Sequence, residues 1–117
     1  MYKSTVKEIG PLVESFKEEN LVILFGPAAP NELREVSVIH EQSETSDVPI
    51  QEGGQFQVDD QTYTVRSVGS QANANLKDLG HISIYFSEPD EGLLPGAVLI
   101  ESGSVPSFKE GSVITFN

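Results

Sequence analysis

The strongest constraint on the fold of this chain is a series of short runs rich in Val, Ile, Thr, Tyr and Phe, separated by Gly, Pro, Asn and Asp. Such runs are typical of short β-strands joined by turns. About eight strands are expected from this pattern. Their ranges are 2–9, 21–25, 35–41, 55–58, 62–68, 81–87, 97–101 and 113–116. The pattern therefore predicts a mainly β protein.

Two short helices are expected between the strands. The segment 11–19 begins with Pro11, which suits a first helical turn, and its apolar residues form one stripe. The segment 73–79 is followed by Gly80, and glycine is the preferred residue just past a helix end. At most one further helical turn is expected at 31–34.

The connections between the expected strands indicate how the strands are arranged. A tight turn at 59–61 predicts a hairpin, whereas the polar segment 42–54 is expected to form a long exposed loop. Many short strands with such connections favour a closed or nearly closed antiparallel barrel, because closure removes exposed strand edges. A two-sheet sandwich is the alternative. Since no repeat or long linker divides the chain, we expect a single domain over 1–117.

The charge of the chain limits its partners. It carries 18 Asp and Glu against 7 Lys and Arg, a formal net charge of −11. This excess of carboxylates repels polyanions, so we expect no nucleic acid and no anionic membrane surface as partner, but rather a basic protein. No apolar run approaches the roughly 20 residues that span a bilayer, so we expect a cytoplasmic protein without direct membrane insertion.

The residue types that can carry chemistry are few. The chain has no cysteine, which excludes thiol catalysis and cysteine-bound metals. Neither of the two histidines, His40 and His81, has the spacing of a metal site, and no nucleotide-binding or nucleophilic-serine motif occurs. The clusters of acidic residues are most simply solvated surface. No metal and no cofactor is therefore expected.

His40 and His81 remain as candidate functional residues. His40 is expected at the end of the strand 35–41, beside the polar loop, and its imidazole titrates near neutral pH. His81 opens the strand 81–87. For each histidine the alternative is a structural role, as a core or capping side chain held by a carbonyl.

Three segments together are similar to a known family. They are Val38-Ile39-His40, the stretch NLKDLGHI at 75–82, and a tail that runs from LPG at 94–96 through Pro106 to GSV at 111–113. In order and spacing they resemble the glucitol/sorbitol-specific IIA component of the bacterial phosphoenolpyruvate-dependent sugar phosphotransferase system. The resemblance covers nearly the whole chain.

The resemblance implies a phosphocarrier, a phosphotransferase component that acts through a phosphohistidine. His40 would accept a phosphoryl group from phospho-HPr and pass it to the IIB component of a sorbitol/glucitol permease. An imidazole nitrogen is a good nucleophile at neutral pH, so this relay needs neither metal nor cysteine. The resemblance also implies that the active face of HPr is basic, so an acidic surface on this chain would steer HPr by complementary charge.

The resemblance also implies details of the site. His40 should be exposed enough for two partner proteins, and His81 would support the phosphoryl group or orient His40. Ser43 and Thr45 are candidates to stabilise the phosphoryl group near His40. Some relatives carry a second histidine two positions beyond the first, where this chain has Gln42. The alternative is a non-catalytic β-barrel interaction or ligand-binding domain in which both histidines are structural.

Overall fold

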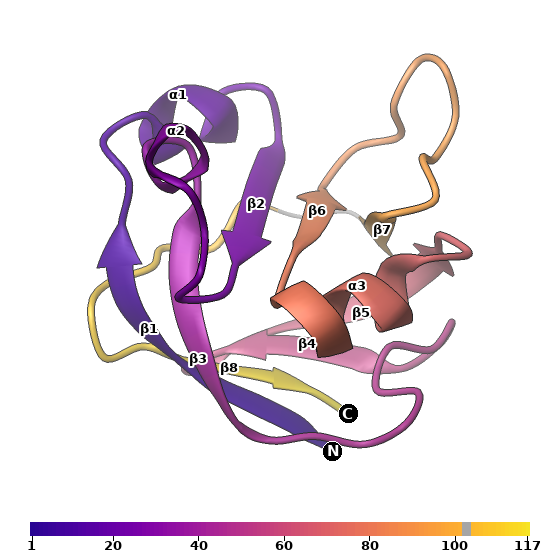
Figure 1. Cartoon of the computed structure of the whole chain (residues 1–117). Coiled ribbons are helices and arrows are strands. Elements are labelled where there is room, and N and C mark those ends of the chain that lie inside the picture. Colours follow the sequence, from indigo (N-terminus) through magenta and orange to yellow (C-terminus); the bar gives the residue numbers. More distant parts are fainter. Residues whose placement is uncertain (102–103) are drawn as a thin grey trace.

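The structure is a computed structural model that describes residues 1–101 and 104–117. Over these residues the chain forms eight strands and three short helices (Figure 1). In chain order they are β1 (Tyr2–Ile9), α1 (Val13–Lys17), β2 (Leu21–Phe25), α2 (Asn31–Arg34), β3 (Val38–Glu44), β4 (Gln55–Val58), β5 (Gln61–Val68), α3 (Ala72–Leu79), β6 (Ile82–Tyr85), β7 (Ala97–Glu101) and β8 (Val113–Phe116). The prediction of a mainly β protein is confirmed, and α2 is the single helical turn that the sequence allowed.

The strands close into a barrel in the order β1-β3-β2-β6-β7-β5-β4-β8. The predicted barrel is thus confirmed over the sandwich. Two neighbouring pairs, β2 with β3 and β6 with β7, are parallel rather than antiparallel. Each of these pairs is joined by a segment long enough to return the chain to the end where the first strand began, through α2 in one case and residues 86–96 in the other.

Strand β3 differs most from its expected range. It begins at Val38 and continues to Glu44, into the segment that was expected to be a loop. This extension pairs with β1, where Gln42 lies opposite Ser4 and Glu44 opposite Lys3. The side chains of 41–44 are all exposed, so the extension lacks the alternation of apolar and polar residues by which a strand is recognised in a sequence.

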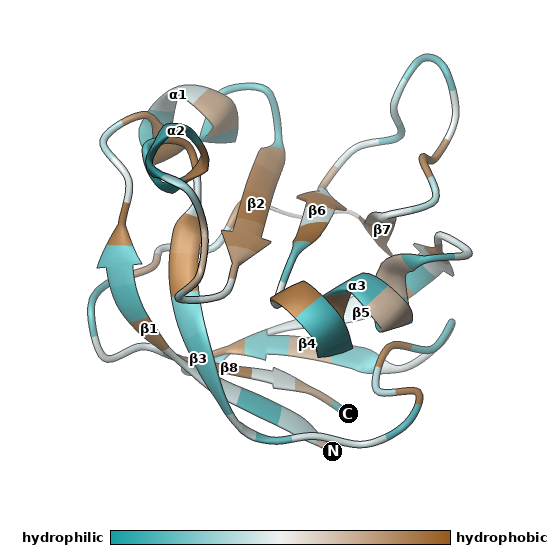
Figure 2. Cartoon of the chain, viewed as in Figure 1, coloured by the Kyte–Doolittle hydropathy of each residue, from teal (hydrophilic) through white to brown (hydrophobic). Residues whose placement is uncertain are grey.

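The barrel interior is one apolar core. The largest of its fully buried members come from β1, β2, β4, β6, β7, β8 and α3, together with Ile50 between β3 and β4. The apolar colouring of β2 is plain in Figure 2. Helix α3 contributes Ala72 and Leu76 to this core and ends at Gly80, which adopts the left-handed conformation with φ +67°. The predicted helix end is therefore confirmed.

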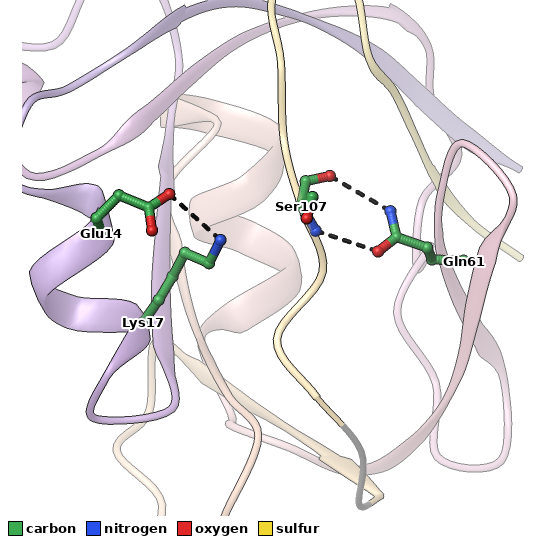
Figure 3. A network of polar contacts seen from close by, with 4 residues as sticks. All are labelled: Glu14, Lys17, Gln61 and Ser107. Carbon is green, nitrogen blue, oxygen red and sulfur yellow. Dashed lines mark hydrogen bonds and ion pairs between the residues drawn. The ribbon is translucent and has the colours of Figure 1, made fainter.

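Figure 3 shows two polar contacts, one that holds an irregular segment to the barrel and one within α1. Gln61, at the start of β5, donates to the Ser107 carbonyl at 3.3 Å and accepts from its backbone N–H at 3.1 Å, which anchors the chain ahead of β8. In α1 the Lys17 ammonium pairs with the Glu14 carboxylate at 3.3 Å.

Candidate functional site

His40 lies on β3 at the base of a cavity of about 350 Å³. The cavity lies between the segment that follows β2 and the end of α3. Its lining consists of Tyr2, Phe25, Gly26, Pro27, Ala28, Pro30, His40, Gln42, Lys77, Asp78, Leu79 and Gly80. His40 itself is 1% exposed. The structure therefore places the first candidate residue beneath a cavity rather than on an open surface.

Both ring nitrogens of His40 are hydrogen-bonded. Nε2 is 2.7 Å from the Gly80 carbonyl oxygen, and Nδ1 is 2.7 Å from the Ser4 hydroxyl oxygen. A carbonyl oxygen only accepts, so Nε2 carries the proton, and in the neutral ring the Ser4 hydroxyl donates to Nδ1. Burial lowers the pKa of His40, and the hydrogen bond to Gly80 offsets part of that effect. His40 is thus a neutral imidazole with its proton on Nε2.

The two nitrogens of His40 differ in their access to the cavity. Gly80 lines the cavity, whereas Ser4 is 0% exposed and is not part of the lining. Nε2 therefore points toward the cavity and Nδ1 toward the barrel interior. A group that enters the cavity reaches Nε2 first, once the Gly80 carbonyl gives way.

Two glycines bring the cavity walls together. The Gly26 N–H donates to the Leu79 carbonyl at 2.9 Å, and a Cβ placed on Gly80 would lie 2.9 Å from the Gly26 Cα. Gly80 also has a positive φ, a backbone conformation that residues other than glycine rarely adopt. Glycine at these two positions lets the end of α3 approach β2 closely enough for its carbonyl to reach His40.

His81 lies beside the cavity wall rather than against His40. Its ring stacks on Phe25 with the ring centroids 4.3 Å apart. Burial lowers the pKa of His81 as well. Phe25 also packs with Ala29 and Ile39 in a small apolar cluster outside the barrel core. The two candidate histidines therefore lie in the same region, since His81 directly follows Gly80, whose carbonyl accepts a hydrogen bond from His40. The His40 ring nitrogens, however, are hydrogen-bonded to Ser4 and Gly80 and not to His81.

Two expectations about the surroundings of His40 are wrong. His40 is neither at the end of its strand nor exposed, because β3 continues to Glu44 and the end of α3 covers the ring. The Ser43 and Thr45 hydroxyls donate to the carbonyls of Lys3 and Ser46, each at 3.3 Å, and their role near the phosphoryl group stays a prediction.

Sequence reasoning missed Ser4, the hydroxyl that does contact His40. Its position on the inward face of the first strand, between Tyr2 and Val6, was visible in the sequence. What the sequence does not show is that β1 pairs with β3, with Val6 opposite His40. A polar residue on an otherwise apolar strand face is the signal that could have pointed to it.

The cavity also carries charged and apolar groups near its opening. Lys77 and Asp78 line it from the last turn of α3, together with Leu79, which is 51% exposed. An ammonium group at this position offers an anion a point of attraction. Within residues 1–101 and 104–117, no cluster of three potential metal ligands occurs. In the same ranges, no helix combines the length and apolarity that crossing a bilayer requires.

The fold and the site together define a class of protein. It is a small, closed β-barrel with a buried, hydrogen-bonded histidine beneath a cavity. Comparisons with known proteins give the family. The family model described as PTS system glucitol/sorbitol-specific IIA component matches residues 1–115. The chain belongs to this family, as the resemblance predicted.

Individual relatives agree with this assignment. The chain is 33% identical over 117 residues to the PTS system glucitol/sorbitol-specific EIIA components of Shigella flexneri and of Escherichia coli (strain K12), covering 99% of this chain and 94% of each relative. A crystal structure of a PTS system IIA component from Enterococcus faecalis V583 superposes with a TM-score of 0.84 and 28% sequence identity. That match covers 97% of this chain and 98% of the other.

Proposed function

We propose that this chain is a phosphocarrier domain in which His40 accepts a phosphoryl group from phospho-HPr and passes it to the IIB component of a sorbitol/glucitol permease. The observation that carries the proposal is the position of His40: in a chain of the IIA family, its Nε2 points toward the cavity beside β2 and α3. As a IIA component it would act in the cytoplasm, where its phosphoryl donor is found.

The state of the ring supports nucleophilic attack. Its lowered pKa keeps the imidazole neutral at pH 7, so one nitrogen lone pair is available. In the transfer, Nε2 first loses its proton while Nδ1 gains one; the freed Nε2 lone pair then forms a bond to phosphorus as the bond between phosphorus and the donor nitrogen breaks, and that electron pair stays on the donor. When the group moves on to IIB, the bond between Nε2 and phosphorus breaks as phosphorus bonds to the acceptor atom of IIB, and the electron pair returns to Nε2.

The cavity supplies features that such a transfer needs. The transferring phosphoryl group carries its charge on three oxygens, and catalysis consists mainly of positioning and charge stabilisation. The Lys77 ammonium in the cavity wall is a source of positive charge. Because the Gly80 carbonyl occupies the space in front of Nε2, the end of α3 has to move when a partner delivers the phosphoryl group.

His81 is proposed to support this movement. Its ring packs on Phe25, which lines the cavity, and it follows Gly80 in the chain. Through these two neighbours it would help to return the α3 end to its resting position. This role is indirect, so loss of His81 should slow transfer without abolishing phosphorylation.

The test is phosphoryl transfer from labelled phosphoenolpyruvate through Enzyme I and HPr to the wild type, His40→Gln and His81→Ala. His40→Gln is chosen because an amide can replace part of the hydrogen bonding and so preserve the fold, which circular dichroism would check. We expect labelling to be lost in His40→Gln and retained in His81→Ala. Labelling of folded His40→Gln, or none of folded wild type, would refute the proposal and favour the non-catalytic barrel.

A further inference from the structure

The inner face of β1 places two hydroxyl groups beneath the candidate site. Tyr2 and Ser4 alternate into the barrel interior and are 1% and 0% exposed. Strand β1 pairs with β3 so that this face lies beside His40, and the rings of Tyr2 and His40 are 6.3 Å apart. The Ser4 hydroxyl therefore lies on the side of His40 that faces away from the cavity, whereas Tyr2 belongs both to this face of β1 and to the cavity lining.

The Tyr2 hydroxyl is unusual because it is buried without a hydrogen-bond partner in the described part of the chain. Burial raises the pKa of Tyr2 to about 12, although the nearby Ser4 hydroxyl offsets part of the rise. The phenol is thus close to Ser4 but makes no hydrogen bond of normal geometry to it. Buried hydroxyl groups are usually satisfied, so an unused one beside Ser4 indicates a role in another state of the site.

Transfer to Nε2 reverses the hydrogen bonding of the ring. At rest Nε2 carries the proton and Ser4 donates to Nδ1. A neutral imidazole that attacks through Nε2 must carry its proton on Nδ1 instead. The partner of Nδ1 must then accept a hydrogen bond, and a serine hydroxyl is able to do either.

We propose that Ser4 and Tyr2 are positioning residues for phosphoryl transfer at His40, in which Ser4 turns from donor to acceptor at Nδ1 and its own O–H then donates to the Tyr2 hydroxyl oxygen. The inference rests on the proposed function. The resting structure contains the first arrangement, and the unpartnered phenol supplies the acceptor for the second.

The proton count balances across the change. When the Gly80 carbonyl moves away, water that enters the cavity takes the Nε2 proton, while Ser4 passes its hydroxyl proton to Nδ1 and takes one from the Tyr2 hydroxyl. Tyr2 lines the cavity and regains its proton from that water, so no net proton is consumed. The Nε2 lone pair then forms the bond to phosphorus as the donor's bond to phosphorus breaks. In the product, Nε2 carries the phosphoryl group and Nδ1–H donates to Ser4. This protonated ring is also the better leaving group for onward transfer.

The test compares matched serine variants. Ser4→Ala removes the hydroxyl at Nδ1, and Ser4→Thr retains one. Ser37→Ala is the control, because Ser37 is also 0% exposed but its hydroxyl has no partner within the described residues. Tyr2→Phe keeps the aromatic ring and carries the test if Ser4→Ala fails to fold. Phosphoryl transfer from phospho-HPr is measured against pH, and ¹⁵N signals of the His40 ring are recorded before and after phosphorylation.

We expect Ser4→Ala to slow transfer on the order of tenfold, because a buried ring N–H loses its acceptor, while Ser37→Ala behaves as wild type. Ser4→Thr should restore most of the rate, and Tyr2→Phe should slow transfer with little loss of stability. The phosphorylated wild type should show the phosphoryl group on Nε2 and a proton on Nδ1, whose pKa falls in Ser4→Ala.

Two results would overturn this inference and leave the proposed function intact. In the first, the wild type is phosphorylated at His40 but Ser4→Ala transfers as fast as Ser37→Ala. In the second, the phosphoryl group is found on Nδ1. A folded wild type that takes no label would instead overturn the proposed function, and this inference with it.

Discussion

Replacing Gly80 by alanine should destabilise the protein through two separable costs. At its φ of +67° an L-residue costs about 1 kcal/mol relative to glycine. The added Cβ would also lie 2.9 Å from both the Cα and the backbone N of Gly26, which must shift, and such overpacking typically costs about 1–3 kcal/mol. We therefore expect Gly80→Ala to lower the free energy of unfolding by about 2–4 kcal/mol.

The matched control for this prediction is Gly53→Ala. Gly53 also has a positive φ, +82°, but a Cβ there would meet nothing within 4 Å, so only the backbone cost of about 1 kcal/mol applies. Urea unfolding of both variants gives the difference between their free energies of unfolding. In thermal unfolding of a domain of this size, each kcal/mol corresponds to about 4 °C in Tm.

The Gly80 variant should also disturb the site. Its Cβ would lie 3.3 Å from Nε2 of His40, so the ¹⁵N signal of that nitrogen should shift in Gly80→Ala and stay unchanged in Gly53→Ala. Equal losses of stability in the two variants would refute the reasoning, because they would show that the contact between Gly80 and Gly26 does not limit the packing at the site.

Three further predictions concern other parts of the chain. Because burial lowers the pKa of His40, the folded protein binds fewer protons than the unfolded one below about pH 6.5, so its free energy of unfolding decreases as the pH falls. Urea unfolding at pH 5 and 7 should show a smaller decrease for His40→Gln, and the difference should be at most about 1.4 kcal/mol per pH unit. Lys77→Gln should slow phosphoryl transfer by about two- to fivefold at low salt and less at high salt, whereas Lys17→Gln, which only breaks the α1 pair with Glu14, should leave the rate unchanged. Asp59→Ala should lower the free energy of unfolding by about 1–2 kcal/mol, because the Asp59 carboxylate accepts hydrogen bonds from Ser112 and Val113 at 2.8 and 3.0 Å; Asp60→Ala, in the same turn, should melt like wild type.

Local signals in the sequence were sufficient for much of the fold. The hairpin turn between β4 and β5, predicted at 59–61, and the helix that ends at Gly80 both depend on residues next to each other in the chain. Both were predicted, although Gln61 already belongs to β5. The extension of β3 over 42–44 was not, because its side chains are exposed on both faces and only the pairing with β1 makes it a strand. Parallel pairing of β2 with β3 likewise depends on the closed barrel rather than on either strand alone.

The candidate site was predictable only in part for the same reason. His40 could be singled out as a titratable residue on an apolar strand. Its burial could not, since the groups that cover it, Ser4 and Gly80, are separated from it by 36 and 40 positions in the chain. The hydrogen bonds that decide which nitrogen carries the proton are set by the tertiary structure.

The end of α3 explains why an empty carrier would keep His40 covered. Gly80 ends the helix in the left-handed conformation, and this turn directs its carbonyl at Nε2. The carbonyl ends of a helix carry partial negative charge, which favours an N–H at that nitrogen but repels a phosphoryl group bound to it. On the proposed function, phosphorylation therefore replaces an attraction between His40 and Gly80 by a repulsion. The loaded and empty forms must then differ at the contact between Gly80 and Gly26, which lies at the cavity where both partner proteins would have to bind.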